Sequence, residues 1–266
     1  MKVQNYKEYF STNIRNDQSV IFHNADIYPP NFTELRSVSW LTTDEALTVE
    51  HRLIPKNKDY TWQPKVAKFV ADSNLGKWMR QHVLEPILYT TNVVQWRNYE
   101  ASYDVNELEP SSRTNQTYAL REYFVPVENF DRFAIKMADI YKKHQANIIN
   151  VSIRHALPDS GSLLAWARTE VFAFVVYYRQ GTSEAAQKEV ALWSREIINA
   201  IIEENGAYYL PYQLHATSEQ FVNAYPRAGE YFELKRKVDP EYRFRNKLWQ
   251  QHYEANRKHT AGYKRE

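Results

Sequence analysis

Between Arg121 and Tyr212 the chain alternates four strand-like runs with two amphipathic helical patterns, in the order βαββαβ. That order is typical of the split-βαβ arrangement, in which helices cover one face of a mostly antiparallel sheet. We expect the strands at 121–127, 147–156, 170–178 and 207–212, with the helices starting near Asn129 and Ser183. The pattern therefore predicts an α+β fold, centred on a ferredoxin-like βαββαβ unit with its helices on one face.

The spacing of apolar residues supports both helices. In the first helix they recur every three or four residues, which places them on one side: Phe130, Phe133, Met137 and Ile140. The second helix has an equivalent stripe: Ala186, Val190, Trp193, Ile197 and Ile201. Asn205 and Gly206 follow that stripe, and both residue types accept the left-handed conformation that ends helices. Thr217 and Gln220 have capping-box spacing for a further short helix.

Prolines divide the rest of the chain. We expect residues 1–118 to form an irregular N-terminal part, with strands at 34–40, 48–53 and 93–103 and one or two helices at 66–84. Residues 119–258 are predicted to form the ferredoxin-like domain. The polar segment 259–266 is expected to be a frayed tail.

Composition excludes several kinds of chemistry. The chain has no cysteine, so disulfides, thiolate nucleophiles and cysteine metal sites are ruled out. Its eight histidines show no metal-ligand spacing, and no glycine-rich phosphate loop or GxSxG motif occurs. A net charge of +2 does not indicate an acidic partner. No apolar run approaches the roughly 18 residues of a membrane span, so a soluble, cytoplasmic protein is predicted.

The strand expected at 147–156 carries the most informative polar pattern. Because side chains alternate between the faces of a strand, Asn150, Ser152 and Arg154 share one face, about 6–7 Å apart along it. Arg154 either stabilises negative charge on a substrate oxygen or lies on a solvent-facing surface. A structural ion pair with Glu122 or Glu170 is a third interpretation. On the strand expected at 207–212, Tyr212 is placed to join this polar face.

One alternative function is RNA binding. The run VFAFVVY at 171–177 matches the aromatic half of an RNP1 motif, and the βαββαβ order suits an RNA-recognition fold. Glu170 and Val171 stand where that motif has a basic residue and a glycine. No convincing RNP2 motif appears at 121–127. A buried central strand explains the same run without RNA.

Ten segments in a fixed order resemble a known family. From about Val20 to Trp249 they are VIFHNADIYPP, RLIPKN, GKWMR, WRNYEASYDVNELEP, REYFVPVENFDRF, INVSIRHALPDSGSLLAWAR, VFAFVVYYRQGTSEA, YYLPYQLHAT, AYP and DPEYRFRNKLW. They look like the C-terminal part of FAD-dependent oxidoreductases of the vanillyl-alcohol-oxidase type. Within that group they are nearest to sugar-1,4-lactone oxidases such as D-arabinono-1,4-lactone oxidase.

The resemblance implies a substrate cap that roofs the pocket over the flavin ring of a two-domain flavoprotein. The glycine-rich FAD-binding domain of such enzymes is not expected in a chain with six scattered glycines, so it would be supplied in cis or in trans. The reaction implied is oxidation of a hydroxyl-bearing substrate, a sugar lactone or a polyol, with hydride transfer to the flavin. This chain alone is expected neither to bind FAD tightly nor to turn over substrate.

The resemblance also assigns roles to residues. Members of the family commonly carry an acid-x-Arg pair on the strand facing the flavin; here Arg154 is kept and Ser152 stands in place of the acid. A lysine usual near the fourth strand aligns with Tyr212. Arg154 would stabilise charge, with Ser152 and Tyr212 hydrogen-bonding the substrate.

Further residues are expected around these: Asn150, Glu122 and Tyr123 as substrate-binding, and Arg245, Asn246 and Lys247 as reaching toward the FAD domain. The competing class is a non-catalytic binding or interaction module.

Overall fold

A computed structural model describes residues 1–56, 58, 63–103 and 112–253. They form helices and a six-stranded antiparallel sheet with the strand order β2-β1-β4-β5-β3-β6. The strands are β1 (Val20–Ile27), β2 (Leu35–Leu41), β3 (Gln116–Pro126), β4 (Ile148–Ala156), β5 (Val171–Gly181) and β6 (Ala207–Tyr208). The predicted α+β class is confirmed, while the ferredoxin-like grouping of β3 to β6 stays a prediction. The tail predicted at 259–266 lies outside the described residues.

The chain divides into two compact units. The first unit comprises Met1–Leu120, Gln145–Arg154 and Val176–Gln187, and the second comprises Arg121–His144, His155–Val175 and Lys188–Glu266. The chain first passes from one to the other between Leu120 and Arg121, and the predicted division into 1–118 and 119–258 stays a prediction.

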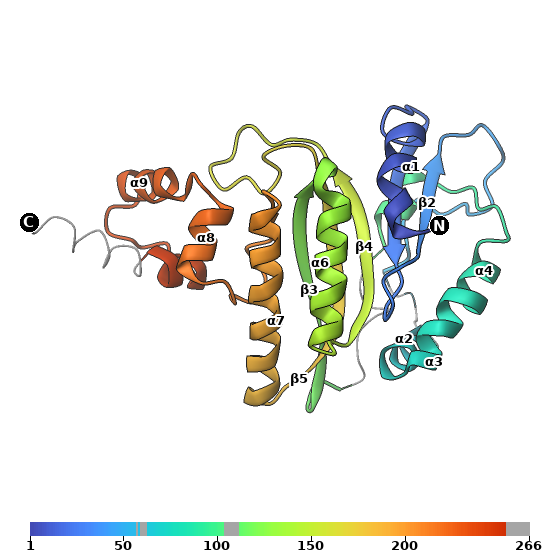
Figure 1. Cartoon of the computed structure of the whole chain (residues 1–266). Helices are drawn as coiled ribbons and strands as arrows, with labels where there is room; N and C mark the ends of the chain where they lie inside the picture. The colour runs from blue at the N-terminus through green and yellow to red at the C-terminus, as the bar shows by residue number, and fades with distance from the viewer. Residues whose placement is uncertain (57, 59–62, 104–111, 254–266) are drawn as a thin grey trace, which may run out of the picture. The chain divides into compact units, whose positions relative to one another are not determined.

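Two helices carry the core of the second unit, α6 (Phe130–Lys143) and α7 (Glu184–Glu203), which lie side by side over the strands (Figure 1). The predicted stripe of α6 faces β5, where the ring centroids of Phe130 and Phe172 are 5.2 Å apart and those of Phe133 and Phe174 are 4.8 Å apart. All four rings are fully buried. Val171 and Ala173, on the other face of β5, pack with Phe124, so β5 is apolar on both faces, as a central strand requires.

Tight packing ends α7. Asn205 adopts a left-handed conformation with φ 56°, and the N–H of Gly206 donates to the carbonyl of Ile201 over 2.8 Å. A Cβ atom on Gly206 would lie 2.4 Å from the carbonyl oxygen of Phe124 and 2.7 Å from Cγ2 of Ile201. Glycine is required at position 206 because the backbone of Phe124 and the side chain of Ile201 lie too close to it for any larger residue.

We expect Gly206→Ala to destabilise the second unit by about 1–3 kcal/mol, the usual cost of overpacking. Gly229→Ala is the matched control, because its Cβ atom would meet nothing within 4 Å at the start of α9 (Ala228–Val238). Alanine also favours a helix over glycine by up to about 1 kcal/mol. Urea unfolding of both variants measures the difference. Equal stabilities would show that Gly206 is not held as closely as the structure indicates.

The fourth strand is shorter than predicted. β6 contains only Ala207 and Tyr208 and pairs with Phe124 and Tyr123 of β3. Leu210 and Pro211 form a turn directly afterwards, and proline has no N–H to continue a ladder. Tyr212 therefore lies beyond the strand, and the prediction that Tyr212 lies on the fourth strand was wrong.

The first unit contains more regular structure than predicted for residues 1–118. β1 was not anticipated, β2 occupies the strand predicted at 34–40, and the two pair antiparallel. Tyr6 and Phe10 of α1 (Tyr6–Asn13) contact His23 of β1, each with ring centroids 6.0 Å apart.

The strands predicted at 48–53 and 93–103 were wrong, apart from an isolated bridge between Val49 and Gln95. α5 (Arg97–Ala101) lies in the second of them.

Helices do occupy the segment around the prediction at 66–84. They are α2 (Gln63–Asp72), α3 (Asn74–Met79), a π-helical turn η2 (Arg80–Leu84) and α4 (Glu85–Leu88). Val70 and Ala71 of α2 pack with Tyr118 and Ile149. This contact holds the helical segment against the strands of the first unit and brings Arg80 and Glu85 to the sheet.

Candidate functional site

The predicted polar face of β4 exists, and β1 lies beside it. Along β4 the buried residues alternate with Asn150 and Ser152, which are half-buried, and with Arg154, which is exposed. β1 pairs antiparallel with β4, so that Asp26 lies directly opposite Ser152. Opposite residues of paired strands share a face. The polar face of the first unit is therefore formed by two strands, β1 and β4.

Hydrogen-bond donors converge on the carboxylate of Asp26. Asn150 donates from Nδ2 to Oδ1 over 2.8 Å, and Nδ2 of Asn24 lies 3.4 Å from Oδ2. Ser152 also donates to this carboxylate. Burial nevertheless raises the pKa of Asp26, and the positive charge of Arg80 and the bonds from Asn150 and Ser152 oppose that rise. Asp26 is thus a half-buried carboxyl that holds its proton more tightly than an ordinary aspartate.

The raised pKa of Asp26 predicts how the free energy of unfolding depends on pH. Because the folded state binds the proton of Asp26 more tightly, the stabilisation is complete below the unfolded pKa of 3.8 and is lost as the pH rises through the folded value. Asp26→Asn removes that dependence. We expect wild type to lose stability relative to Asp26→Asn as the pH rises above about 4. Urea unfolding across this range measures it, and a constant difference between the two proteins contradicts the assignment.

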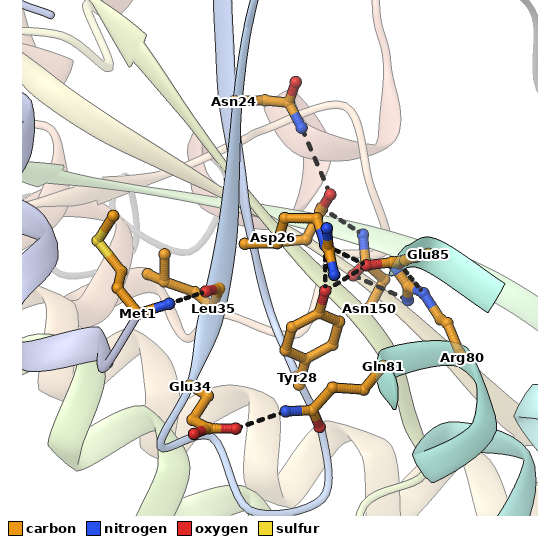
Figure 2. A network of polar contacts seen from close by, with 11 residues as sticks. Met1, Asn24, Asp26, Tyr28, Glu34, Leu35, Arg80, Gln81, Glu85 and Asn150 are labelled. Atoms are coloured by element: carbon orange, nitrogen blue, oxygen red, sulfur yellow. Dashed lines mark hydrogen bonds and ion pairs between the residues drawn. The ribbon is translucent and has the colours of Figure 1, made fainter. Parts of the chain in front are cut away.

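An ionic network lies beside Asp26 and is linked to it through Asn150 (Figure 2). Arg80 donates from Nη1 to Oδ1 of Asn150 over 3.1 Å and from Nε to Oε1 of Glu85 over 2.6 Å. The hydroxyl of Tyr28 donates to Oε2 of Glu85, which also lies 3.2 Å from Nε of Arg36. Both carboxylate oxygens of Glu85 are therefore engaged, and its side chain is only 11% exposed.

The outer end of the polar face is Arg154. Its side chain is exposed, and among the residues that the structure describes none forms a hydrogen bond or ion pair with its guanidinium. The ion pairs considered with Glu122 and Glu170 do not form. Glu170 instead contacts Nε2 of His155 over 2.7 Å, and Glu122 accepts a bond from Tyr212. Arg154 is thus available to a ligand.

The other predicted substrate-binding residues lie in the second unit. The hydroxyl of Tyr212 donates to Oε1 of Glu122 over 2.9 Å, so these two predicted residues do come together. The ring of Tyr212 also lies edge-on to Tyr209, with centroids 5.2 Å apart. Tyr123 does not join them, because its side chain is 1% exposed and its ring packs toward Phe133. Its neighbour Glu122 projects from the other face of β3.

The residues predicted to reach the FAD domain are all at the surface. Arg245, Asn246 and Lys247 are exposed. Oδ1 of Asn246 accepts the backbone N–H of Trp249 over 2.8 Å, which is the bond of a helix N-cap. This contact gives Asn246 a structural role, while Arg245 and Lys247 present charge to the solvent.

The donors of this chain fit only part of a flavin. No described glycine has a positive φ, so the part of the chain that the structure describes lacks the glycine turn that brings backbone N–H groups to a pyrophosphate. The polar face offers a guanidinium, two amides and a hydroxyl, which suit the carbonyl oxygens at the edge of a flavin ring or of a substrate. The dinucleotide itself would need another domain.

Sequence reasoning missed the partners of the β4 face: Asp26, Tyr28, Arg36, Arg80 and Glu85. A signal for β1 was present, because Asn24 and Asp26 alternate with the apolar residues Ala25 and Ile27. That period-two pattern predicts a strand with one polar face. No pattern local to Arg80 or Glu85 indicates that they reach β4.

The structure also bears on other kinds of function. Phe172 and Phe174, two of the three aromatic residues of the RNP1-like run, are buried against α6, so neither of these rings is free to stack on a base. Within the described ranges, no three histidine or acidic side chains are grouped to hold a metal ion, and no helix is long and apolar enough to cross a membrane. Comparison with protein-family models and with curated proteins gives no match.

Proposed function

We propose that this chain is the substrate cap of an FAD-linked oxidoreductase that oxidises a hydroxyl-bearing substrate, a sugar lactone or a polyol. One observation carries the proposal: Arg154 stands exposed and unpaired among the described residues, at the end of a polar strand face that contains Ser152 and Asn150. Most of that face is satisfied internally. An unpaired guanidinium at its open end suits a ligand oxygen that carries or develops negative charge.

Within this proposal each residue has a specific task. Arg154 stabilises negative charge on the substrate oxygen, and the hydroxyl of Ser152 orients that oxygen. Tyr212 and Glu122 of the second unit form a polar pair of their own, and their predicted contact with substrate hydroxyls is separate from the site on β1 and β4. Glu122 accepts the phenol proton and so fixes the direction of the Tyr212 hydroxyl.

The cofactor is supplied from outside this chain. When bound, FAD supplies the acceptor for the substrate's hydride, and the FAD-binding domain is provided in cis or in trans. Arg245 and Lys247 are proposed to contact that domain, since both are exposed cations. The cytoplasmic location predicted from the sequence belongs to the same proposal.

The decisive experiment pairs this chain with a flavin domain. The coding sequence adjoining that of this chain is read for a glycine-rich FAD-binding segment, and the two are produced together. We expect a yellow assembly whose flavin absorbance is lost when it is mixed anaerobically with D-sorbitol or D-glucono-1,4-lactone, whereas the chain purified alone is colourless. A yellow assembly whose flavin stays oxidised with both substrates contradicts the proposal. Failure to find any flavin-binding partner favours a non-catalytic binding module.

A further inference from the structure

The polar face holds a carboxylate with spare capacity. Oδ1 of Asp26 accepts a bond of 2.8 Å from Asn150, whereas Nδ2 of Asn24 lies 3.4 Å from Oδ2. A contact of 3.4 Å is longer than a normal N–H···O bond. An ionised carboxylate accepts about four hydrogen bonds. Even with Ser152 donating as well, the acceptor capacity of Asp26 is incompletely used.

Glu85 shows what a purely structural carboxylate looks like in this unit. It is 9% exposed, and its two oxygens receive Arg80, Arg36 and Tyr28. Asp26 differs on both counts. It is half-buried, so part of the residue remains accessible, and none of the ion pairs among the described residues includes it. Glu85 thus belongs to a closed ionic network, whereas Asp26 lies on the polar face of β1 and β4.

The position of Asp26 relates it to Arg154. Asp26 lies opposite Ser152 in the β1–β4 ladder, and Arg154 is the next residue on the same face of β4. Positions two residues apart on a strand are separated by roughly 6–7 Å. A hydroxyl-bearing ligand at this open end meets a guanidinium, a hydroxyl and a carboxylate together. The guanidinium can stabilise a negatively charged oxygen, and the carboxylate can accept a proton.

We infer that Asp26 is the catalytic proton acceptor of this face, taking the proton of the substrate hydroxyl that Arg154 and Ser152 position. The inference rests on the proposed function. The O–H bond breaks and its proton passes to Asp26 as a carbon–oxygen double bond forms; the flavin of the proposed function, when bound, would supply the acceptor for the hydride that the carbon loses.

The environment of Asp26 suits this role. Burial raises its pKa, while Arg80 and the donors Asn150 and Ser152 limit the rise, and the negative charge of Glu85 adds to it. A general base works best when its pKa approaches the working pH. Asn150 also links Asp26 to Arg80, because it donates to one and accepts from the other. Arg80 thereby holds the carboxamide in the orientation that keeps its N–H on Asp26.

The test uses the full chain and D-sorbitol as the probe, without flavin. Carbon-13 NMR of aspartate-labelled protein follows the Asp26 carboxyl, which is identified by its loss in Asp26→Asn. We expect sorbitol to lower the pKa of Asp26, because a hydroxyl that donates to the carboxylate favours its ionised form. Asp26→Asn should weaken sorbitol binding at neutral pH about tenfold, since a bond to a charged group is lost.

Two variants separate the possible results. Arg154→Gln removes the guanidinium and is also expected to weaken sorbitol binding, as the proposed function requires. If Arg154→Gln weakens binding and Asp26→Asn does not, with the Asp26 signal unmoved by sorbitol, the inference about Asp26 is overturned while the proposed function stands. If wild type binds no sorbitol and the assembled flavin is not reduced by it, both are overturned. Asn31→Ala, exposed in the β1–β2 connection, is the control that should bind like wild type.

Discussion

Replacing Arg154 with alanine is expected to slow flavin reduction in the assembled enzyme by about 10²–10³-fold, the usual effect of removing one group that stabilises a developing oxyanion. The loss should fall mainly on kcat, because the charge on the substrate oxygen grows as the reaction proceeds. Arg154→Lys should recover part of it, since a lysine keeps the charge but not the planar fork of donors. Anaerobic rapid mixing with D-sorbitol measures the rate.

Arg154→Ala should change the reaction rate without changing the stability of the protein. Arg154 is exposed and has no partner among the described residues, so its replacement should leave stability within about 0.5 kcal/mol of wild type. Arg236, exposed on α9, provides a control arginine whose replacement should leave the rate unchanged. Equal rates for Arg154→Ala and Arg236→Ala would remove Arg154 from the proposed site. A loss of stability without a change in rate would give it a structural role instead.

The elements with a strong local pattern were predictable. α6 and α7 carry their apolar residues at helical spacing, and both occur at the predicted places. The capping box of Thr217 and Gln220 is also present, at the start of α8 (Ser218–Ala224). Each of these features is fixed by contacts within a few residues of the chain, so the sequence pattern alone is sufficient.

The segment at 93–103 shows where local reasoning fails. Its tryptophan and tyrosines favour a strand by composition, yet α5 forms there. Tyr99 and Tyr103 are four residues apart and meet edge-on, with ring centroids separated by 6.0 Å. Tyr103 lies two residues beyond the end of α5, so this contact forms at the end of the helix. Aromatic content alone could not distinguish the two outcomes.

The candidate site was predictable on β4 but not across it. The alternation of Asn150, Ser152 and Arg154 follows from strand geometry, and the burial pattern agrees with it. Asp26 is 124 residues from Asn150 in sequence, and their contact depends on β1 pairing with β4 in one register. A shift of one residue would turn Asp26 to the other face. The carboxylate could therefore be found only from the paired strands.

The second large effect is expected for Glu85→Ala, which should destabilise the first unit by about 3 kcal/mol or more. Breaking a buried ion pair by removing one partner costs about 3–5 kcal/mol, because the opposite charge is left uncompensated. Here two arginines lose their carboxylate, since Arg80 and Arg36 both contact Glu85. Glu34→Ala is the control. Glu34 is exposed, and among the described residues its carboxylate accepts a hydrogen bond only from the neutral amide of Gln81 in η2. Its replacement should therefore destabilise the protein by about 0.5 kcal/mol or less.

Two further variants distinguish lost charge from lost packing. Glu85→Gln keeps the shape of the side chain but not the charge, and it should be nearly as destabilised as Glu85→Ala, because the arginines remain uncompensated. Adding Arg80→Met to Glu85→Gln should restore part of the stability, since one unpaired charge is removed and an apolar side chain fills its place. Urea unfolding followed by circular dichroism measures all four proteins. If Glu85→Gln is as stable as wild type, hydrogen bonding rather than charge holds η2 and α4 to the sheet.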